Sequence, residues 1–347
     1  MRDSDTKRDA YAEAGVDIDA GQDAVRLMGD AVRSTWDKNV LGRYGAFAGL
    51  YGYSASEHGD VIAVTIDGVG TKLKVAVMSG TYSSVGMDIV NHCTDDLLVQ
   101  RARPLLFADY FASSSLTPEV VAEAVGGMAE ACRVVGASLI GGETAEMPGV
   151  YCEGEIDLVG CMVGVAKREE IEDVPPVAPG DVLIGIGSSG LHTNGYSLAR
   201  HLLFTKAGMD VGTEVPELGC RVGEALLEPH LEYLTLLGPN LGDKRIHGLA
   251  HITGGGLFDN VRRVLPEGCA AHIDKSTWEP LPIFRLLQSI GELSDDEAYR
   301  ALNMGVGMVL VVDPAAADEL LAGLGEGEAA VTLIGEVRSG ETGVVLS

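Results

Sequence analysis

Acidic and basic side chains stand among glycines in two short segments, each directly after an apolar run. Asp67-Gly-Val-Gly-Thr-Lys72 follows residues 61–66, and Gly141-Gly142-Glu143-Thr144 follows a second run. Glycines let the backbone approach a ligand closely, while a carboxylate and an ammonium can hold magnesium and a phosphoryl group. The first segment therefore predicts a phosphate loop, for which a β-turn with a surface lysine is the alternative. Its members are Asp67, Gly68, Gly70, Thr71 and Lys72.

A third acidic element lies on a helix predicted over residues 86–101. Its apolar positions recur at helical spacing, and its opposite face carries Asp88, Asn91, His92, Asp95 and Asp96. In so acidic a chain such a face is commonly solvated. Together with the two glycine segments, however, it supplies the hard oxygen ligands that a magnesium-nucleotide site requires.

The segment Gly185-Ile-Gly-Ser-Ser-Gly190 matches the dinucleotide fingerprint G-x-G-x-x-G, with Asp210 near the place of a ribose-binding acid. The NAD fold also needs a strand that ends at that acid, and residues 207–215 are too short and too interrupted by glycine to form one. We therefore favour a strand-to-helix turn that binds an anion at the start of the helix. Its polar members are Ser188, Ser189, His192, Thr193 and Asn194, around Gly190.

A second polar glycine loop, His251-Ile-Thr-Gly-Gly-Gly256, occurs in the C-terminal half, where a linker or helix start is the alternative. Its candidate binding positions are His251, Thr253, Gly254, Gly255 and Gly256. Five other histidines have no companion motif and are expected at surface or structural positions outside the site. These are His58, His201, His230, His247 and His272.

Strands and helices must position these segments. Apolar runs predict strands at 61–66, 104–110, 156–165, 181–187, 306–312 and 330–337, and helices are predicted at 118–136 and from residue 196. Strict alternation of strand and helix is poor, so an α+β fold is favoured over a doubly wound sheet. The proline- and acid-rich segment 168–181 predicts a boundary between domains at 1–170 and 171–347.

Composition restricts the class of protein. The chain has 347 residues, enough for two domains, and its 51 acidic and 25 basic residues give a net charge of −26. Such a charge opposes binding to nucleic acid or anionic membranes, so neither is expected as a partner. Six cysteines without C-x-x-C spacing indicate reduced thiols, and no apolar stretch reaches the about 18 residues of a membrane span. We expect a soluble, cytoplasmic protein.

Seven motifs in one order resemble the aminoimidazole ribonucleotide synthetases, which are the phosphoribosylformylglycinamidine cyclo-ligases of purine biosynthesis. The motifs are YAEAGVDIDAG (11–21), DGVGTKLK (67–74), CTDDLLVQ (93–100), LIGGETAEMPG (139–149), SSGLHTNGYSLAR (188–200), HITGGG (251–256) and NMGVGM (303–308). They extend over residues 11–312, and seven motifs in register are far more specific than any one of them.

The resemblance implies an ATP-dependent ring closure. Formylglycinamidine ribonucleotide would become aminoimidazole ribonucleotide, with release of ADP and phosphate and with Mg²⁺ as a cofactor. It also implies a homodimer, in which the N-terminal domains bind ATP and metal and pair into a shared β-barrel. The C-terminal domain would be an α/β sandwich that binds the ribonucleotide.

Residue roles follow from the same resemblance. Asp67, Asp96 and Glu143 match acids associated with magnesium and the ATP phosphates, and Gly141 and Gly142 flank the last of them. Lys72 would offset charge on the transferring phosphoryl group. From its residue type and its Ser, Thr and Asn neighbours, and not from the resemblance, His192 is a candidate phosphate anchor or proton carrier, with the anchor favoured. The ribonucleotide side would comprise Ser188, Ser189, Gly190, His192, Asn194, His251, Thr253, Gly254, Gly255 and Gly256.

Three places depart from the family pattern. Asp95 stands where asparagine is expected, Arg101 stands where glycine is expected, and residues 228–237 (EPHLEYLTLL) differ from a segment usually written with Thr-Arg and Tyr-Val. The first change could alter the charge balance at the metal. The last one concerns the early part of the C-terminal domain.

Other functions remain as alternatives. A sister ATP-using enzyme, such as a selenophosphate synthetase, thiamine phosphate kinase or formylglycinamidine ribonucleotide synthetase, would share the pattern of acids and glycines. A scaffold or carbamoyl-transfer maturation factor and a NAD-dependent oxidoreductase belong to other classes. The pair NGYSLAR and HITGGG favours the cyclo-ligase.

Overall fold

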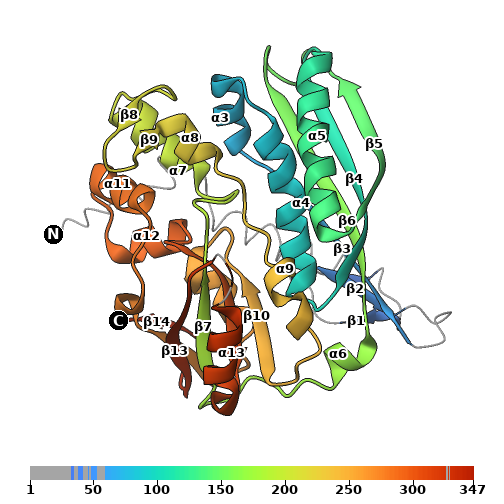
Figure 1. The fold of residues 1–347 in the computed structure, drawn as a ribbon, viewed down its shortest axis with the longest axis vertical. Helices are drawn as coiled ribbons and strands as arrows, with labels where there is room; N and C mark the ends of the chain where they lie inside the picture. Colours follow the sequence, from blue (N-terminus) through green and yellow to red (C-terminus); the bar gives the residue numbers. More distant parts are fainter. Residues whose placement is uncertain are drawn as a thin grey trace.

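The computed structural model describes residues 33–34, 38–41, 46, 48–52, 59–325, 327 and 329–347. The motif at 11–21 and His58 lie outside the described residues. Two six-stranded sheets, one in each half of the chain, occupy different parts of the molecule and are flanked by helices (Figure 1). This mixture confirms the predicted α+β fold class.

The first sheet has the strand order β1-β2-β3-β6-β4-β5, and every pairing is antiparallel except that of β4 with β5. Its strands are β1 (Val40–Leu41), β2 (Gly49–Gly52), β3 (Val61–Gly68), β4 (Arg103–Ser113), β5 (Ser138–Glu146) and β6 (Ile156–Ala166). Helices α4 (Ser83–Leu98) and α5 (Pro118–Val135) cover one face of this sheet (Figure 1). Helix α3 (Lys72–Ser79) begins shortly after β3.

The second sheet has the order β10-β12-β7-β13-β11-β14, and only β11 and β14 pair in parallel. Its strands are β7 (Val182–Gly187), β10 (Ile246–His251), β11 (Cys269–Ile273), β12 (Val306–Val312), β13 (Val331–Ser339) and β14 (Gly343–Leu346). The α-helices of this half are α7 (Tyr196–Arg200), α8 (Val222–Leu227), α9 (Leu234–Leu237), α10 (Gly256–Arg262), α11 (Pro282–Gly291), α12 (Asp295–Ala301) and α13 (Ala317–Leu324).

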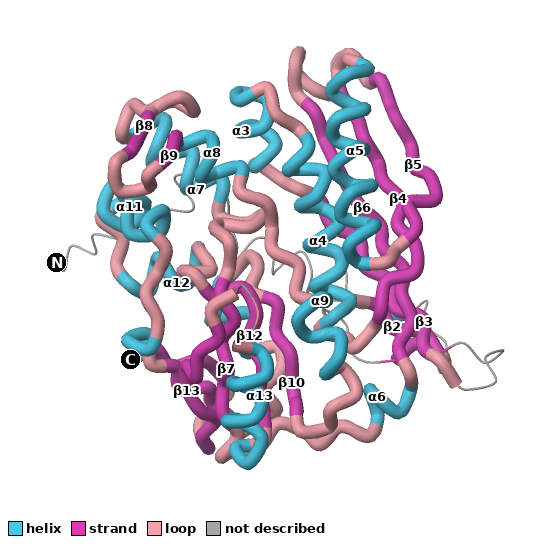
Figure 2. The backbone as a smooth tube through the Cα atoms, in the orientation of Figure 1, coloured by secondary structure: helices cyan, strands magenta, loops and turns pink. Residues whose placement is uncertain are grey.

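Shorter elements complete this half (Figure 2). Helix α7 continues as the π-helix η1 (His201–Lys206), and β8 (Glu214–Val215) pairs with β9 (Cys220–Arg221) in a separate two-stranded sheet. The 3-10 turns are η2 (Gly238–Asn240), η3 (Lys275–Thr277) and η4 (Pro314–Ala316). No helix among the residues described is long and apolar enough to cross a membrane.

The local sequence explains the predicted elements that the structure confirms. Helix α5 begins at Pro118, whose fixed φ suits a first helical turn, and ends before Gly136, which takes a φ of 73°. Strand β12 is buried along its whole length, as its unbroken run of apolar residues and glycine predicts for a strand covered on both faces. The strands predicted at 61–66, 104–110 and 156–165 are likewise confirmed in place and type.

The segment 168–181 connects the two halves and is packed against both. It contains the short helix α6 (Arg168–Glu172), where Glu170 accepts a hydrogen bond from Arg103 at 2.8 Å. At its other end Asp181 Oδ2 lies 2.8 Å from His247 Nδ1. The larger cluster of buried apolar side chains includes residues of both halves, so the core is continuous across this segment. A domain boundary here stays a prediction.

Candidate functional site

Lys72 opens helix α3 and points into the interior. Its Nζ lies 2.7 Å from Asp88 Oδ2, and both side chains are completely buried. Nζ also donates hydrogen bonds to the carbonyl oxygens of His192, at 3.1 Å, and Glu228, at 2.7 Å. Burial lowers the pKa of Lys72, and attraction to Asp88 opposes that shift. Sequence reasoning offered a phosphate loop or a surface lysine for this position. Burial excludes the surface lysine, and the role on a phosphate loop stays a prediction.

The polar face of α4 is the contact surface between the two halves. Asn91 Nδ2 donates to the carbonyl of His230 at 2.6 Å, and Asp88 Oδ1 accepts from the His230 backbone N–H at 2.7 Å. Asp95 Oδ1 accepts from the backbone N–H of Tyr233 at 2.9 Å. This acidic face is therefore buried by the segment between α8 and α9, and it is not solvated.

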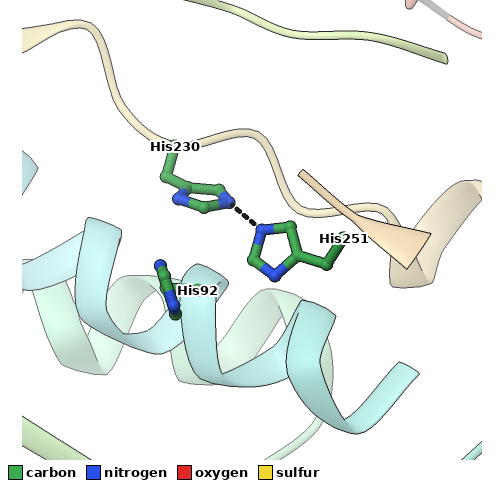
Figure 3. A group of neighbouring side chains, drawn as sticks. All are labelled: His92, His230 and His251. Atoms are coloured by element: carbon green, nitrogen blue, oxygen red, sulfur yellow. Dashed lines mark hydrogen bonds between the residues drawn. The ribbon is translucent and has the colours of Figure 1, made fainter. Parts of the chain in front are cut away.

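Four histidines from distant parts of the chain form a buried cluster at this junction, which we call the histidine cluster: His92, His192, His230 and His251. His230 Nε2 lies 3.1 Å from His251 Nε2, as Figure 3 shows with His92 beside them. The His192 ring stacks on His230, with centroids 4.0 Å apart. Sequence reasoning expected His230 at a surface or structural position outside the site. The structure excludes the surface position, because the side chain is buried at the centre of this cluster.

The protonation of these histidines depends on their neighbours. Burial holds the pKa of His192 and of His230 well below the ordinary value, so both are neutral at pH 7. His92 is buried as well, but its contact with Asp67, with Asp96 adding to it, outweighs burial and raises its pKa to about 9. The cluster thus places a cationic imidazole next to neutral ones.

Two of the predicted magnesium ligands come together. Asp67 Oδ2 lies 2.9 Å from His92 Nε2, and Asp96 Oδ2 lies 3.9 Å from the same nitrogen. Asp96 also accepts a hydrogen bond from Thr65 Oγ1 at 3.1 Å, and its Oδ1 lies 3.0 Å from His251 Nδ1. Magnesium commonly uses one or two protein carboxylates together with substrate phosphates, so Asp67 and Asp96 fit that requirement.

Glu143 does not join them within one chain. Asp67 pairs with Gly160 of β6, Gly160 with Asp109 of β4, and Asp109 with Gly142 of β5. Three interstrand spacings therefore separate Asp67 from the Gly141-Gly142-Glu143 segment, which is roughly 14 Å. The predicted set of Asp67, Asp96 and Glu143 is thus not assembled by a single chain.

The loop after β7 turns its polar groups inward. Ser189 Oγ donates to the carbonyl of Pro229 at 2.6 Å, and Ser188 Oγ donates to Asn303 Oδ1 at 3.1 Å. His192 has a φ of 60° and is only 1% exposed, and its Nε2 accepts a hydrogen bond from the Ser189 N–H at 3.3 Å. The imidazole of His192 thus lies in the interior, four residues before α7 begins at Tyr196, and its role toward a substrate phosphate stays a prediction.

The two polar glycine loops predicted to share a ligand lie beside each other. A Cβ atom at Gly254 would stand 3.4 Å from Asn194 Oδ1. Buried Asn260 fixes the second loop, since its Nδ2 donates to the carbonyls of Thr253, Gly254 and Gly256. Gly256 has a φ of 59°, and a Cβ there would meet the carbonyl of Tyr299 at 2.0 Å, so only glycine fits.

Arg101 and Asp95, which depart from the family pattern, each contact residues of the C-terminal half. Arg101 has a φ of 60°, which explains a glycine at this position, and its guanidinium donates to the carbonyls of Leu241, at 2.6 Å, and Ile246. Asp95 Oδ2 lies 3.3 Å from His230 Nε2. Sequence reasoning included His92 on the polar face of α4 but set His230 aside, although His230 stands within the departing segment 228–237.

Family models match both halves of the chain. The N-terminal domain of the AIR synthase related proteins matches residues 48–166, and the C-terminal domain matches residues 178–346. The phosphoribosylformylglycinamidine cyclo-ligase of Trichlorobacter lovleyi is 46% identical over 334 residues, which cover 96% of this chain and 95% of that protein. The same enzyme of Thermoanaerobacter sp. (strain X514) is 45% identical over 337 residues, or 97% and 99% of the two chains.

Solved structures share the fold at lower identity. Thiamine-monophosphate kinase from Stenotrophomonas maltophilia K279a superposes with a TM-score of 0.62 at 20% identity, covering 94% of this chain and 95% of that one. E. coli HypE does so with 0.61 at 19% identity, covering 94% and 93%. These similarities show the fold alone. Because the curated relatives match at more than twice that identity over nearly the whole chain, this chain belongs to the phosphoribosylformylglycinamidine cyclo-ligase family.

Proposed function

We propose that the chain closes the imidazole ring of aminoimidazole ribonucleotide at the expense of ATP. The observation that carries this is the match of at least 43% identity over nearly full length to curated cyclo-ligases. The formyl oxygen attacks the γ-phosphorus, and the bond to ADP breaks. The amidine nitrogen then attacks the former formyl carbon, the C–O bond to phosphate breaks, and the nitrogen loses a proton.

The chain's own residues divide this task between two places. Asp67 is partly exposed beside Asp96, so this pair would hold Mg²⁺, which neutralises charge on the ATP phosphates. The adjacent loops around Asn194 and Gly254 would bind the ribonucleotide. Lys72 and His192 are positioning residues in this proposal, because Lys72 Nζ holds the His192 carbonyl and thereby fixes the loop that follows β7.

Use of ATP has support from the fold. The structure of AaThiL complexed with AMPPCP and TMP superposes with a TM-score of 0.63 at 15% identity, and AMPPCP is an analogue of ATP. Enzymes such as thiamine-monophosphate kinase stay the alternative for this chain, but they match at 20% identity or less in these examples. The sequence relatives therefore favour the cyclo-ligase.

A homodimer has support from the outer face of the first sheet. Large apolar side chains are exposed there or at its rim: Tyr51, Val64, Ile66, Leu105, Ile140 and Val150. Ile66 is 67% exposed and Ile140 is 63% exposed, and exposed apolar side chains gathered on one sheet favour an interaction surface there. We propose that two such sheets pair into a shared β-barrel, which could bring Glu143 of one chain towards a neighbour's site. All six cysteines are free, in agreement with the cytoplasm as the proposed location.

ADP release tests the activity directly. Purified protein is mixed with ATP, Mg²⁺ and either formylglycinamidine ribonucleotide or thiamine phosphate, and ADP and the imidazole product are followed. We expect both products with formylglycinamidine ribonucleotide alone. ADP release with thiamine phosphate, and none with the ribonucleotide, would overturn the proposal.

A further inference from the structure

We propose that His92, His230 and His251 bind a transition-metal ion of the Zn²⁺ class, with the buried carboxylate of Asp95 beside the ion. His92 would give up the proton that it holds beside Asp67, so this site adjoins the proposed magnesium position. The three imidazoles each offer a ring nitrogen, and these atoms lie within 4.8 Å of one another (Figure 3). Three imidazole nitrogens are a donor set typical of zinc and of its neighbours, whereas magnesium prefers oxygen ligands.

The first argument is the approach of two imidazole nitrogens. His230 Nε2 and His251 Nε2 are 3.1 Å apart. Two ligands bound at 2.0–2.1 Å to a tetrahedral zinc ion stand about 3.3 Å from each other, so the observed separation suits a shared ion. A single proton between the two nitrogens is the competing explanation, and it predicts no affinity for metal.

The second argument is an orphaned carboxylate oxygen. Asp95 is completely buried, and its Oδ2 accepts no hydrogen bond although it lies 3.3 Å from His230 Nε2. The other oxygen of this carboxylate is satisfied by the backbone N–H of Tyr233. A buried carboxylate oxygen without a hydrogen bond is costly unless a cation compensates it, and a metal bound to His230 and His251 would stand beside it.

The third argument concerns the side chains that hydrogen-bond the proposed ligands. Asp96 Oδ1 lies 3.0 Å from His251 Nδ1, so a proton held at Nδ1 leaves Nε2 available for a metal. Thr193 Oγ1 lies 2.6 Å from His92 Nδ1 and 3.4 Å from His230 Nδ1. Such carboxylate and hydroxyl partners orient metal-binding imidazoles in many sites.

The proposed ligands come from both halves of the chain. Asp95 and His230 both stand at positions that depart from the family pattern, and they come from opposite halves of the chain. An ion held by α4, by the segment after α8 and by β10 would fasten the two halves together. The inference therefore goes beyond ring closure and is tested without an activity assay.

Metal content and spectroscopy test the site. The full-length protein, free of any affinity tag, is stripped with a chelator, dialysed against Zn²⁺ or Co²⁺, and analysed by elemental mass spectrometry, visible absorption and thermal unfolding. We expect one equivalent of metal, the intense visible bands of four-coordinate Co²⁺ and a rise in Tm on adding metal. Absence of stoichiometric metal from the folded wild type would overturn the proposal.

Matched variants locate the ion. His230→Thr removes one ligand, and Asp95→Asn removes the charge beside the ion. Both should weaken Co²⁺ binding at least about tenfold, and His230→Thr should also abolish the visible bands. His272→Gln removes a histidine outside the cluster and should bind as the wild type does. Equal binding by His230→Thr, or by Asp95→Asn, with a native circular dichroism spectrum would contradict the site. If either variant fails to fold, the cobalt spectrum of the wild type alone tests the site.

Discussion

Asp95 of α4 and His230 of the segment after α8 face each other where the two halves of the chain meet, with Asp95 Oδ2 3.3 Å from His230 Nε2. Asp95 stands where asparagine is expected, and His230 lies in segment 228–237, which departs from the family pattern. A carboxylate introduced alone into this interior would lack an ionisable partner. Asp95 and His230 are therefore expected to depend on each other, because the carboxylate of Asp95 lies beside the imidazole of His230.

A double-mutant cycle should reveal this dependence. In metal-free protein, Asp95→Asn and His230→Thr together should change the free energy of unfolding by an amount that differs from the sum of the single changes by roughly 0.5–3 kcal/mol. Urea unfolding followed by circular dichroism measures the four free energies. Strict additivity would show that the two side chains are energetically independent.

Lys72→Met should destabilise the fold strongly. The substitution leaves Asp88 buried without its cation, which typically costs about 3–5 kcal/mol. Lys74→Met is the matched control, because the Lys74 side chain is 41% exposed beside Glu155 and such pairs contribute at most about 1 kcal/mol. Similar unfolding free energies for the two variants would contradict the buried pair.

Arg101 offers a test in which backbone and side chain act in opposite directions. Arg101→Ala and Arg101→Gly both remove the guanidinium bonds to Leu241 and Ile246, so both should destabilise the protein by about 1–3 kcal/mol. At a φ of 60° glycine is free of the strain that alanine retains, and Arg101→Gly should be the more stable variant by about 1 kcal/mol. The reverse order in chemical unfolding would contradict the left-handed conformation.

Asp96→Asn should reduce ring closure by about 10²–10³-fold at saturating Mg²⁺, because it removes one charge from a site of phosphoryl transfer. The rate of ADP release at saturating substrates measures this loss. The surface variant Asp173→Asn, whose carboxylate pairs only with exposed Lys244, should retain full turnover. Near-normal turnover of Asp96→Asn would remove this residue from the proposed magnesium site.

Ile66→Lys and Ile140→Lys should shift the proposed homodimer towards monomers. A charge on each of these exposed apolar positions would be buried without a partner when two sheets pair. Val134→Lys places the same charge on α5, at a position that is 60% exposed but lies on the helical side of the sheet, and should leave the mass unchanged. Light scattering at micromolar concentration distinguishes the two outcomes, and an unchanged dimer mass in both sheet variants would contradict this interface.

The sequence by itself determined the elements and the family. Strand β12 is a run of apolar residues with one glycine, and α5 has a proline at its start and a glycine at its end. The glycine motifs at 67–72 and 251–256 can each be recognised from a few residues. Each of these signals lies within a short stretch of sequence, so it can be recognised without knowledge of the fold.

Only the tertiary structure decided which polar groups meet. Lys72 is held by Asp88 and by carbonyls more than one hundred residues away, His230 lies in the cluster without any local motif, and Glu143 stands three strands from Asp67. The polar face of α4 looks the same in the sequence whether it is solvated or buried. Burial and partner choice depend on contacts between distant segments, and periodicity and spacing along the chain carry no information about those contacts.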